Sequence, residues 1–260
     1  MTALLEIDRL CRYFGGVKAV HDVTFAVRQG SIHGLIGPNG SGKTTLFNCL
    51  TGIYHPTSGH VRFKGKRLDR SPPHRTVARG IARTFQNLRL FAGMTALENV
   101  MVARHRHLHA GLAANVFDLG TSRRDHREAV AKAQELLEFC GLAGREDAVA
   151  GGLPYGLQRR LEIARALATE PELLLLDEPA AGMNPAESAA LKELIVDIRR
   201  RGITVFIIEH NVRLVMGLCD IVTVMDSGEV IAFDVPERIV NHPGVIEAYL
   251  GREDAAEMNG

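Results

Sequence analysis

The most informative segment of the chain is Gly37-Pro38-Asn39-Gly40-Ser41-Gly42-Lys43-Thr44. It fits the pattern G-x-x-x-x-G-K-[ST], and it lies between an apolar run (31–36) and a segment of helical period that continues through Leu50. Glycines let successive backbone N–H groups point inward and keep side chains away from a bound anion. The following helix directs the positive end of its dipole at the same point. The stretch therefore predicts a phosphate-binding loop between a strand and a helix.

Individual residues of this loop have predicted roles in holding a nucleotide. Lys43 brings a full positive charge near the β- and γ-phosphates, and the Thr44 hydroxyl is a ligand for Mg²⁺. The cofactors that follow are ATP and Mg²⁺. The predicted nucleotide contacts of the loop are Gly37, Pro38, Asn39, Gly40, Ser41, Gly42, Lys43, Thr44 and Thr45.

A carboxylate at the end of a neighbouring parallel strand should complete such a site. The run Leu173-Leu174-Leu175-Leu176-Asp177-Glu178 supplies it, because four leucines bury the strand and place Asp177 at its carboxyl end. We expect Asp177 to hold Mg²⁺, directly or through water. Glu178 faces differently and can polarise the attacking water as a general base.

The rest of the chain predicts an α/β protein with a helical insertion. Short strands and turns fill the first third, and strand–helix alternation after residue 169 indicates a parallel sheet covered on both faces. Residues 88–168 are instead helical in period, with predicted helices at 94–104, 125–140 and 157–168. We expect an ATP-binding core at 1–87 and 169–251, a helical subdomain at 88–168 and a flexible tail at 252–260.

Composition excludes several classes of protein. The net charge of +1, the absence of Trp and an aromatic content of 5% argue against a nucleic-acid binder. No run of 18 apolar residues is present, so no segment should span a bilayer. The first ten residues carry Glu6 and Asp8 and do not resemble a signal peptide. The scattered cysteines, Cys11, Cys49, Cys140 and Cys219, predict reduced and mostly buried thiols.

Five further segments, in order, resemble the motif set of the ABC ATPases. They are Phe14 before Gly15-Gly16; Gln86 in Arg83-Thr84-Phe85-Gln86-Asn87; Leu153-Pro154-Tyr155-Gly156-Leu157-Gln158 with the helix after it; Ala181-Gly182-Met183-Asn184; and His210 at the end of an apolar strand. The resemblance implies that Phe14 stacks on adenine. It implies that Gln86 links Mg²⁺ and water to the helical subdomain, and that His210 contacts the γ-phosphate.

The same resemblance implies a fold and a dimer. The fold would be a RecA-like P-loop core with a small antiparallel β subdomain and an inserted helical subdomain. Two subunits would pair head to tail, so that Tyr155 and Gly156 of one subunit complete the ATP site on the P-loop of the other. This chain departs from the family pattern at four positions. The signature serine is Pro154, the glycine after it is Tyr155, the signature glutamine is Leu157, and the D-loop aspartate is Asn184.

A narrower resemblance is to the ATPases of the branched-chain amino acid importers. It rests on L-P-Y-G-L-Q-R-R-L-E-I-A-R-A-L (153–167), P-A-A-G-M-N-P (179–185), E-H-N-V-R-L-V-M (209–216) and V-I-E-A-Y-L-G (245–251). The resemblance implies three kinds of partner: two membrane permeases, a second homologous ATPase or a second copy of this chain, and indirectly a periplasmic binding protein. The subunit would then be peripheral on the cytoplasmic face of the inner membrane.

Other functions remain open on the sequence alone. Single-cassette systems for lipopolysaccharide, urea or other amino acids have similar signature sequences. A soluble ABC ATPase of nucleic-acid repair or translation usually carries two cassettes or large inserted arms, which 260 residues do not accommodate. His105, His107 and His109 predict an exposed, solvated segment in preference to a metal site.

Overall fold

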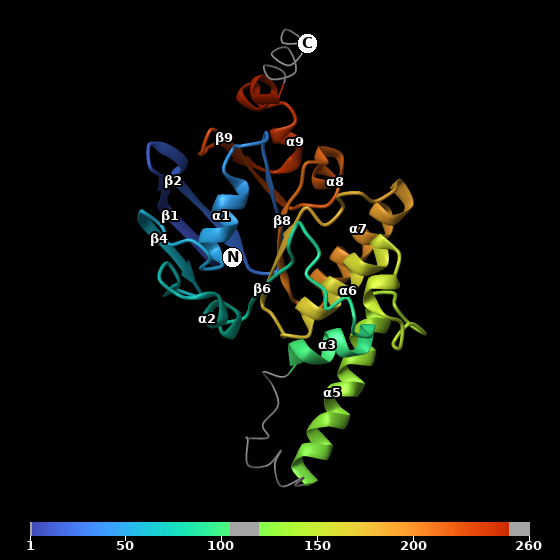
Figure 1. Cartoon of the computed structure of the whole chain (residues 1–260). Coiled ribbons are helices and arrows are strands. Elements are labelled where there is room, and N and C mark those ends of the chain that lie inside the picture. Colours follow the sequence, from blue (N-terminus) through green and yellow to red (C-terminus); the bar gives the residue numbers. More distant parts are fainter. Residues whose placement is uncertain (1, 105–119, 250–260) are drawn as a thin grey trace. The chain divides into compact units, whose positions relative to one another are not determined.

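The computed structural model describes residues 2–104 and 120–249 of the chain (Figure 1). The chain divides into two compact units. We call them the core unit (1–83, 172–180 and 195–260) and the helical unit (84–171 and 181–194). The sequence prediction differed in detail, because it placed its boundaries after residues 87 and 168 and assigned 181–194 to the core. His105, His107, His109 and the tail from 252 lie outside the described residues.

The first sheet of the core unit is antiparallel, with the strand order β2-β1-β4-β5. Buried and exposed side chains largely alternate along β1 and β2, as they do in a sheet with one solvated face. This sheet is the predicted antiparallel β subdomain. Its strands are β1 (Ala3–Phe14), β2 (Val17–Arg28), β4 (Ser58–Phe63) and β5 (Lys66–Arg67).

The second sheet of the core unit has the order β10-β9-β3-β8-β7-β6. Strands β9, β3, β8, β7 and β6 run parallel, and β10 pairs antiparallel with β9. Every residue of β3, β7 and β8 is buried, which explains their continuous apolar sequences. The bounds are β3 Ile32–Ile36, β6 Ile81–Arg83, β7 Leu173–Asp177, β8 Thr204–Ile208, β9 Ile221–Asp226 and β10 Glu229–Asp234.

One hydrophobic core includes side chains of both sheets and of the helix that follows the glycine-rich loop. Leu46, Phe47 and Leu50 of that helix, α1 (Lys43–Leu50), are fully buried in it. Phe63 of β4 and Phe206 of β8 belong to the same core. The burial fixes α1, and with it the loop that precedes it. Three further helices of the described residues lie wholly in the core unit: α2 (Pro73–Ala78), α8 (Val212–Met216) and α9 (Pro236–Ile239).

The helical unit is built around three helices that contact one another: α3, α5 and α6 (Figure 1). Small and apolar residues such as Val100, Ala133, Leu137 and Leu161 are buried in it. A 3-10 turn, η2, precedes α6, and α7 begins in this unit and ends in the core unit. The bounds are α3 Ala96–Arg104, α5 Gly120–Phe139, η2 Ala150–Gly152, α6 Tyr155–Leu167 and α7 Pro185–Arg200.

The structure confirms the α/β class, with its parallel sheet, antiparallel sheet and helical insertion. It corrects the start of two helices. The predicted helix at 125–140 begins at Gly120, and the predicted helix at 157–168 begins at Tyr155, so that Pro154 is its N-cap residue. All four cysteines are buried and form no disulfide, as predicted. Among residues 2–104 and 120–249, no helix is long and apolar enough to cross a membrane.

Candidate active site

The glycine-rich loop connects the buried end of β3 to α1. Gly37 and Gly42 have φ angles of 150° and 99°, which L side chains rarely adopt. A Cβ atom at Gly37 would lie 2.0 Å from the Met225 carbonyl oxygen, and one at Gly42 would lie 2.2 Å from the Ala19 carbonyl oxygen. Both positions therefore require glycine, because conformation and packing each exclude a side chain. Gly42 is also the N-cap residue of α1, so the loop leads directly into the positive end of that helix.

Lys43 folds its side chain back over the loop. Its Nζ donates to the carbonyl oxygens of Gly37, at 2.7 Å, and Pro38, at 2.8 Å. Lys43 is nearly buried, and these two carbonyl oxygens of the loop hold its ammonium group in place. Thr44, the second residue of α1, is exposed, while Ser41 is fully buried. The loop thus has the backbone conformation, the cation and the exposed hydroxyl that a phosphate site with a metal needs.

Asp177 ends β7 with a side chain that is only 3% exposed. Its Oδ2 accepts a hydrogen bond from Arg83, at 2.7 Å. Arg83 is the last residue of β6, and it also donates to Asn48 at 2.8 Å and to Thr51 at 3.1 Å. The guanidinium group therefore connects the Asp177 carboxylate to α1, the helix that carries Lys43 and Thr44.

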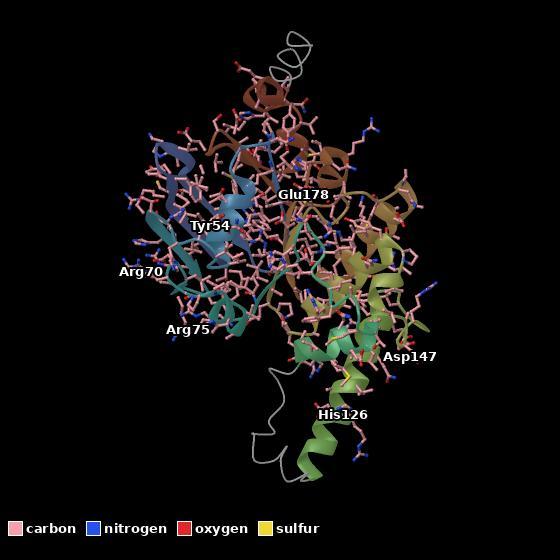
Figure 2. The ribbon with its side chains drawn as sticks, in the orientation of Figure 1. Tyr54, Arg70, Arg75, His126, Asp147 and Glu178 are labelled. Atoms are coloured by element: carbon pink, nitrogen blue, oxygen red, sulfur yellow. The ribbon has the colours of Figure 1, made fainter. Side chains whose placement is uncertain are left out.

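Glu178 follows in a strained turn (Figure 2). Its φ angle is +48°, in the left-handed region that a glutamate seldom occupies. The turn is held because the Glu178 amide donates to the Ile208 carbonyl oxygen of β8, at 2.9 Å. Glu178 Oε1 lies 2.5 Å from His210 Nε2. Two residues that the sequence assigned to catalysis are thus in direct contact.

Glu209 supports the same turn from the end of β8. Its buried carboxylate accepts a hydrogen bond from the Ala180 amide, at 2.8 Å. Burial raises the pKa of the Glu209 carboxyl, while backbone amides, that of Ala180 among them, act against the rise. The Glu178 amide and the Glu209 carboxylate together fix the turn that follows β7 against the end of β8. Sequence reasoning missed Glu209, although a carboxylate next to the predicted histidine at the end of an apolar strand was a usable signal.

The loops after β3, β7 and β8 leave the same edge of the sheet. The three strands are parallel neighbours in the order β3-β8-β7, so their carboxyl ends coincide. Adjacent strands lie about 4.8 Å apart, which places the glycine-rich loop roughly 10 Å from the Asp177-Glu178 turn, with His210 between them. Ligands of open α/β sheets bind outside this edge. The edge therefore brings together the predicted Lys43, Asp177, Glu178 and His210.

Phe14 ends β1 with 39% of its surface exposed. The Arg12 guanidinium carbon lies 4.4 Å from its ring centroid, and Tyr54 meets the ring edge-on, at 5.3 Å between centroids. Tyr54, which precedes β4, is labelled in Figure 2. Exposure of this aromatic ring is compatible with the predicted stacking on adenine, which stays a prediction.

The helical unit contains the other predicted site residues. Gln86 is exposed three residues after Arg83, and Tyr155 and Gly156 are the first residues of α6. Pro154, the N-cap residue, makes no side-chain cap and has no N–H, so this signature lacks the hydroxyl of a serine.

Asn184 has a structural role in the helical unit. Its side chain accepts the Glu187 amide at 2.9 Å, and Glu187 accepts the Asn184 amide at 3.0 Å. This reciprocal pair is a capping box that starts α7.

These loops on a parallel sheet define a P-loop ATPase of the cassette class, and comparisons with known proteins give its family. The ABC transporter family matches residues 20–181, and the branched-chain amino acid ATP-binding cassette transporter family matches 229–255. The chain belongs to the ABC transporter family, and it is an ATP-binding subunit that hydrolyses ATP.

Curated relatives resemble the chain over nearly their whole length. It is 47% identical to the high-affinity branched-chain amino acid transport ATP-binding protein BraF of Pseudomonas aeruginosa, over 95% of this chain and 98% of that protein. Identity to LivG of Escherichia coli K12, which carries the same description, is 45% with the same coverage. The lipopolysaccharide export system ATP-binding protein LptB of Haemophilus influenzae is 35% identical, over 96% and 98%.

Solved structures agree with the fold. The ADP conformation of MJ1267, an ATP-binding cassette of an ABC transporter, superposes with a TM-score of 0.85 at 33% identity, over 96% of this chain and all of that one. A nucleotide-free ATP-binding cassette from an ABC transporter gives a TM-score of 0.83 at 34% identity, over 95% and 99%. The RecA-like cassette fold predicted from the sequence is thereby confirmed.

Proposed function

We propose that this chain hydrolyses ATP to power the import of branched-chain amino acids through an ABC transporter. The observation that carries the cargo is the match of 229–255, a segment outside the nucleotide-binding motifs, to the branched-chain family. The identity of 45–47% to BraF and LivG supports it, while LptB, which represents the lipopolysaccharide alternative, is 35% identical.

Mg²⁺ fits the oxygen ligands that the core unit offers. Mg²⁺ takes hard oxygen ligands, and in phosphate sites it is held by one or two protein oxygens together with the substrate phosphates. The Thr44 hydroxyl is exposed, and the Asp177 carboxylate is oriented by Arg83. When bound, Mg²⁺ would neutralise negative charge on the phosphate oxygens. We assign Thr44 and Asp177 as its ligands from this chain, with Gln86 reaching it through water.

Glu178 is the proposed general base for the attacking water. The carboxylate accepts a proton from water as the oxygen attacks the γ-phosphorus and the bond to the β-phosphate oxygen breaks, which gives ADP and phosphate. The contact with His210 orients this carboxylate, and the anchoring of its turn to Ile208 and Glu209 limits its movement. Lys43 and the loop amides bind the β- and γ-phosphates, and Phe14 stacks on adenine.

A second cassette would complete each nucleotide site. Tyr155 and Gly156 start α6, so their backbone N–H groups are among those that a helix leaves without intrahelical partners. We assign them to the γ-phosphate held by the partner subunit, which is a homologous ATPase or a second copy of this chain. A binding protein that delivers the amino acid acts through the permeases.

The proposed permease contact is an apolar surface of the helical unit. Phe91, Met94 and Val149 are 45%, 37% and 52% exposed. The two segments that carry them are adjacent, because the Ala150 amide donates to the Met94 carbonyl oxygen at 2.9 Å and the Gly151 amide to that of Ala92 at 3.0 Å. Exposed apolar patches of this kind mark protein contacts. Docking there would hold the subunit on the cytoplasmic face of the inner membrane.

Uptake by cells tests the cargo. We expect a strain without this chain to lose ATP-dependent uptake of labelled leucine, isoleucine and valine, and the wild-type chain to restore it. The Lys43→Ala chain should fail to restore it, which controls for expression of an inactive subunit. Restored transport of another solute, with amino acid uptake unaffected by the deletion, would reject the proposed cargo while leaving the ATPase in place.

Crosslinking tests the permease contact. A photo-crosslinker at Met94 should capture a permease in membranes that contain the assembled transporter. The same crosslinker at Val240, which is 53% exposed in the core unit, is the control and should capture none. Equal yields from the two positions, or no permease product from Met94, would refute the assigned surface.

A further inference from the structure

Helix α6 buries two opposite charges that the proposed function does not use. Arg159 and Glu162 are one turn apart, and each side chain is 2% exposed, with 3.2 Å between Arg159 Nη1 and Glu162 Oε2. Burial raises the pKa of the Glu162 carboxyl, against the amide of Phe85 and the charge of Arg159. Buried charges destabilise a protein unless they are paired and hydrogen-bonded. The hydrogen-bond partners of Arg159 and Glu162 therefore indicate what the pair does.

The pair binds the main chain around Gln86. Glu162 Oε1 accepts the amides of Phe85, at 3.3 Å, and Arg89, at 3.5 Å. Arg159 donates to the carbonyl oxygens of Phe85, at 2.6 Å, and Gln86. Donors and acceptors of the same short loop are therefore satisfied by one face of α6, and the backbone of Gln86 is fixed to that helix.

Arg159 also reaches the first residue of its own helix. Its Nε and Nη2 lie 3.1 and 2.9 Å from the Tyr155 hydroxyl oxygen. The Tyr155 ring lies beside Gly182, where a Cβ atom would be 3.3 Å from the ring. One guanidinium group thus joins the main chain of Gln86 to the signature residue Tyr155, and the ring continues this contact to the 181–184 turn.

Lysine cannot reproduce this arrangement. The oxygens of Phe85, Gln86 and Tyr155 together accept from different nitrogens of the guanidinium group. Arg offers five N–H donors in a fixed fork, whereas Lys offers three from one nitrogen. A lysine would keep the charge that Glu162 needs but would lose part of the connection between Gln86 and Tyr155.

We propose that Arg159 is a positioning residue that couples Gln86 to the signature end of α6, so that a nucleotide-dependent change at Gln86 alters Tyr155 and Gly156. The inference rests on the proposed function, because it assumes that Gln86 responds to ATP. The contacts of Arg159 are with Phe85, Gln86, Tyr155 and Glu162, and it is not one of the proposed nucleotide contacts. Its loss should therefore lower turnover without lowering ATP affinity.

The test compares two equivalent substitutions in the full chain carrying Glu178→Gln, which arrests hydrolysis. One is Arg159→Lys. The control is Arg104→Lys. Arg104 is also a buried arginine of the helical unit, and its ion pair is with Glu170, at 2.9 Å, outside both motifs. Hydrogen exchange of peptides covering 85–91 and 153–160 is measured with and without ATP and Mg²⁺. The chain is kept dilute enough to be monomeric, so that no partner's ATP contacts 153–160.

In the parent chain and in the Arg104→Lys control, ATP should protect both peptides. In the Arg159→Lys chain, ATP should still protect 85–91, while its protective effect on 153–160 should fall at least about fivefold, the lower range of measured site-to-site coupling. If Arg159→Lys does not fold, Tyr155→Phe removes the hydroxyl that Arg159 reaches and should give the same result.

Full protection of 153–160 in the Arg159→Lys chain would overturn the proposal, as would ATP binding that alters neither peptide in the parent. Failure of the parent chain to bind ATP would instead reject the proposed function. In the hydrolysing assembled transporter, Arg159→Lys should lower kcat while leaving KM for ATP within about twofold, the split expected when ground-state binding is unchanged. A change in KM alone would contradict the positioning role.

Discussion

Glu178 illustrates how single residues are positioned in this protein. Its left-handed backbone is a conformation that costs on the order of 1–3 kcal/mol, and the hydrogen bonds to Ile208 and from Ala180 to Glu209 hold it in place. In this turn the Glu178 carboxylate contacts His210, whereas the Asp177 carboxylate is paired with Arg83. Neighbouring acidic residues therefore have different partners and different proposed roles.

Two substitutions separate nucleotide binding from hydrolysis. We expect Glu178→Gln to bind ATP with near-normal affinity and to lose at least roughly 10²-fold in hydrolysis, the scale of losing a positioned base. Lys43→Ala should instead weaken nucleotide binding, because it deletes a charge-assisted contact. Titration of a fluorescent ATP analogue into both variants measures the difference. Equal affinities of the two variants would contradict the separate roles.

Arg83 gives a prediction about stability. Removing one partner of a buried ion pair leaves a charge without compensation, so Arg83→Ala should lower the free energy of unfolding by about 3–5 kcal/mol. Arg200→Ala removes an exposed pair, in which Arg200 and Asp197 are 69% and 47% exposed, and should cost at most about 1 kcal/mol. Urea unfolding measures both. Similar losses would show that the Arg83–Asp177 contact does not stabilise the core unit.

At the scale of elements, β3 does more than lead into the phosphate loop. His33 lies in this strand, fully buried against Phe206 and Phe25, and its Nε2 is 2.8 Å from the Thr223 hydroxyl oxygen. Burial lowers the pKa of His33 from 6.5 to about 3. The folded strand therefore holds a neutral imidazole at pH values well above 3.

This histidine predicts a pH dependence of stability. Its pKa is lower in the folded state, so below pH 6.5 the unfolded chain binds a proton that the folded chain does not. His33 should therefore lower stability as pH falls, by about 1.4 kcal/mol between neutral pH and pH 5.5. The His33→Gln chain should lack this part of the pH dependence. Urea unfolding at pH 5.5 and 7.5 measures it, and an identical dependence in both chains would refute the assignment.

Sequence patterns predicted some helices and strands of this protein and missed others. The glycine-rich loop, the strand of four leucines and α1 were predicted because their signals are local and contiguous. Strand β6 was missed, because Ile81–Arg83 is too short for a period and becomes a strand only through pairing with β7. The contacts of Arg83 with Asp177 and of Arg159 with Gln86 join residues 94 and 73 positions apart. Local patterns carry no information about such pairings.

At the scale of the whole molecule, Pro154 predicts unequal nucleotide sites in the dimer. It caps α6 without a hydroxyl, and losing one hydrogen bond to a charged group is worth about 1.5–3 kcal/mol, or one to two orders of magnitude. In the proposed head-to-tail dimer, the signature of this chain would complete the site on the partner's P-loop. If the partner has an intact signature, hydrolysis should be faster at the site holding Lys43 and Glu178.

Inactivating one catalytic glutamate at a time in the assembled complex measures this asymmetry. Loss of Glu178 should abolish most of the activity, whereas loss of the partner's equivalent should leave most of it. A homodimer of this chain alone should be a poor ATPase. Equal losses from the two subunits, or a vigorous homodimer, would mean that the α6 dipole and the Gly156 backbone suffice.

Proteoliposomes show whether ATP hydrolysis by this chain powers amino acid import. The assembled transporter is reconstituted with its ATPase subunits facing the vesicle lumen, and ATP is enclosed in that lumen. ATP hydrolysis and labelled leucine uptake are then measured together for the wild-type and Glu178→Gln chains. We predict that leucine-dependent hydrolysis and uptake fall together in the variant, by the same factor within error. Leucine uptake that persists after hydrolysis is lost, or ATP hydrolysis without any response to leucine, would contradict the account.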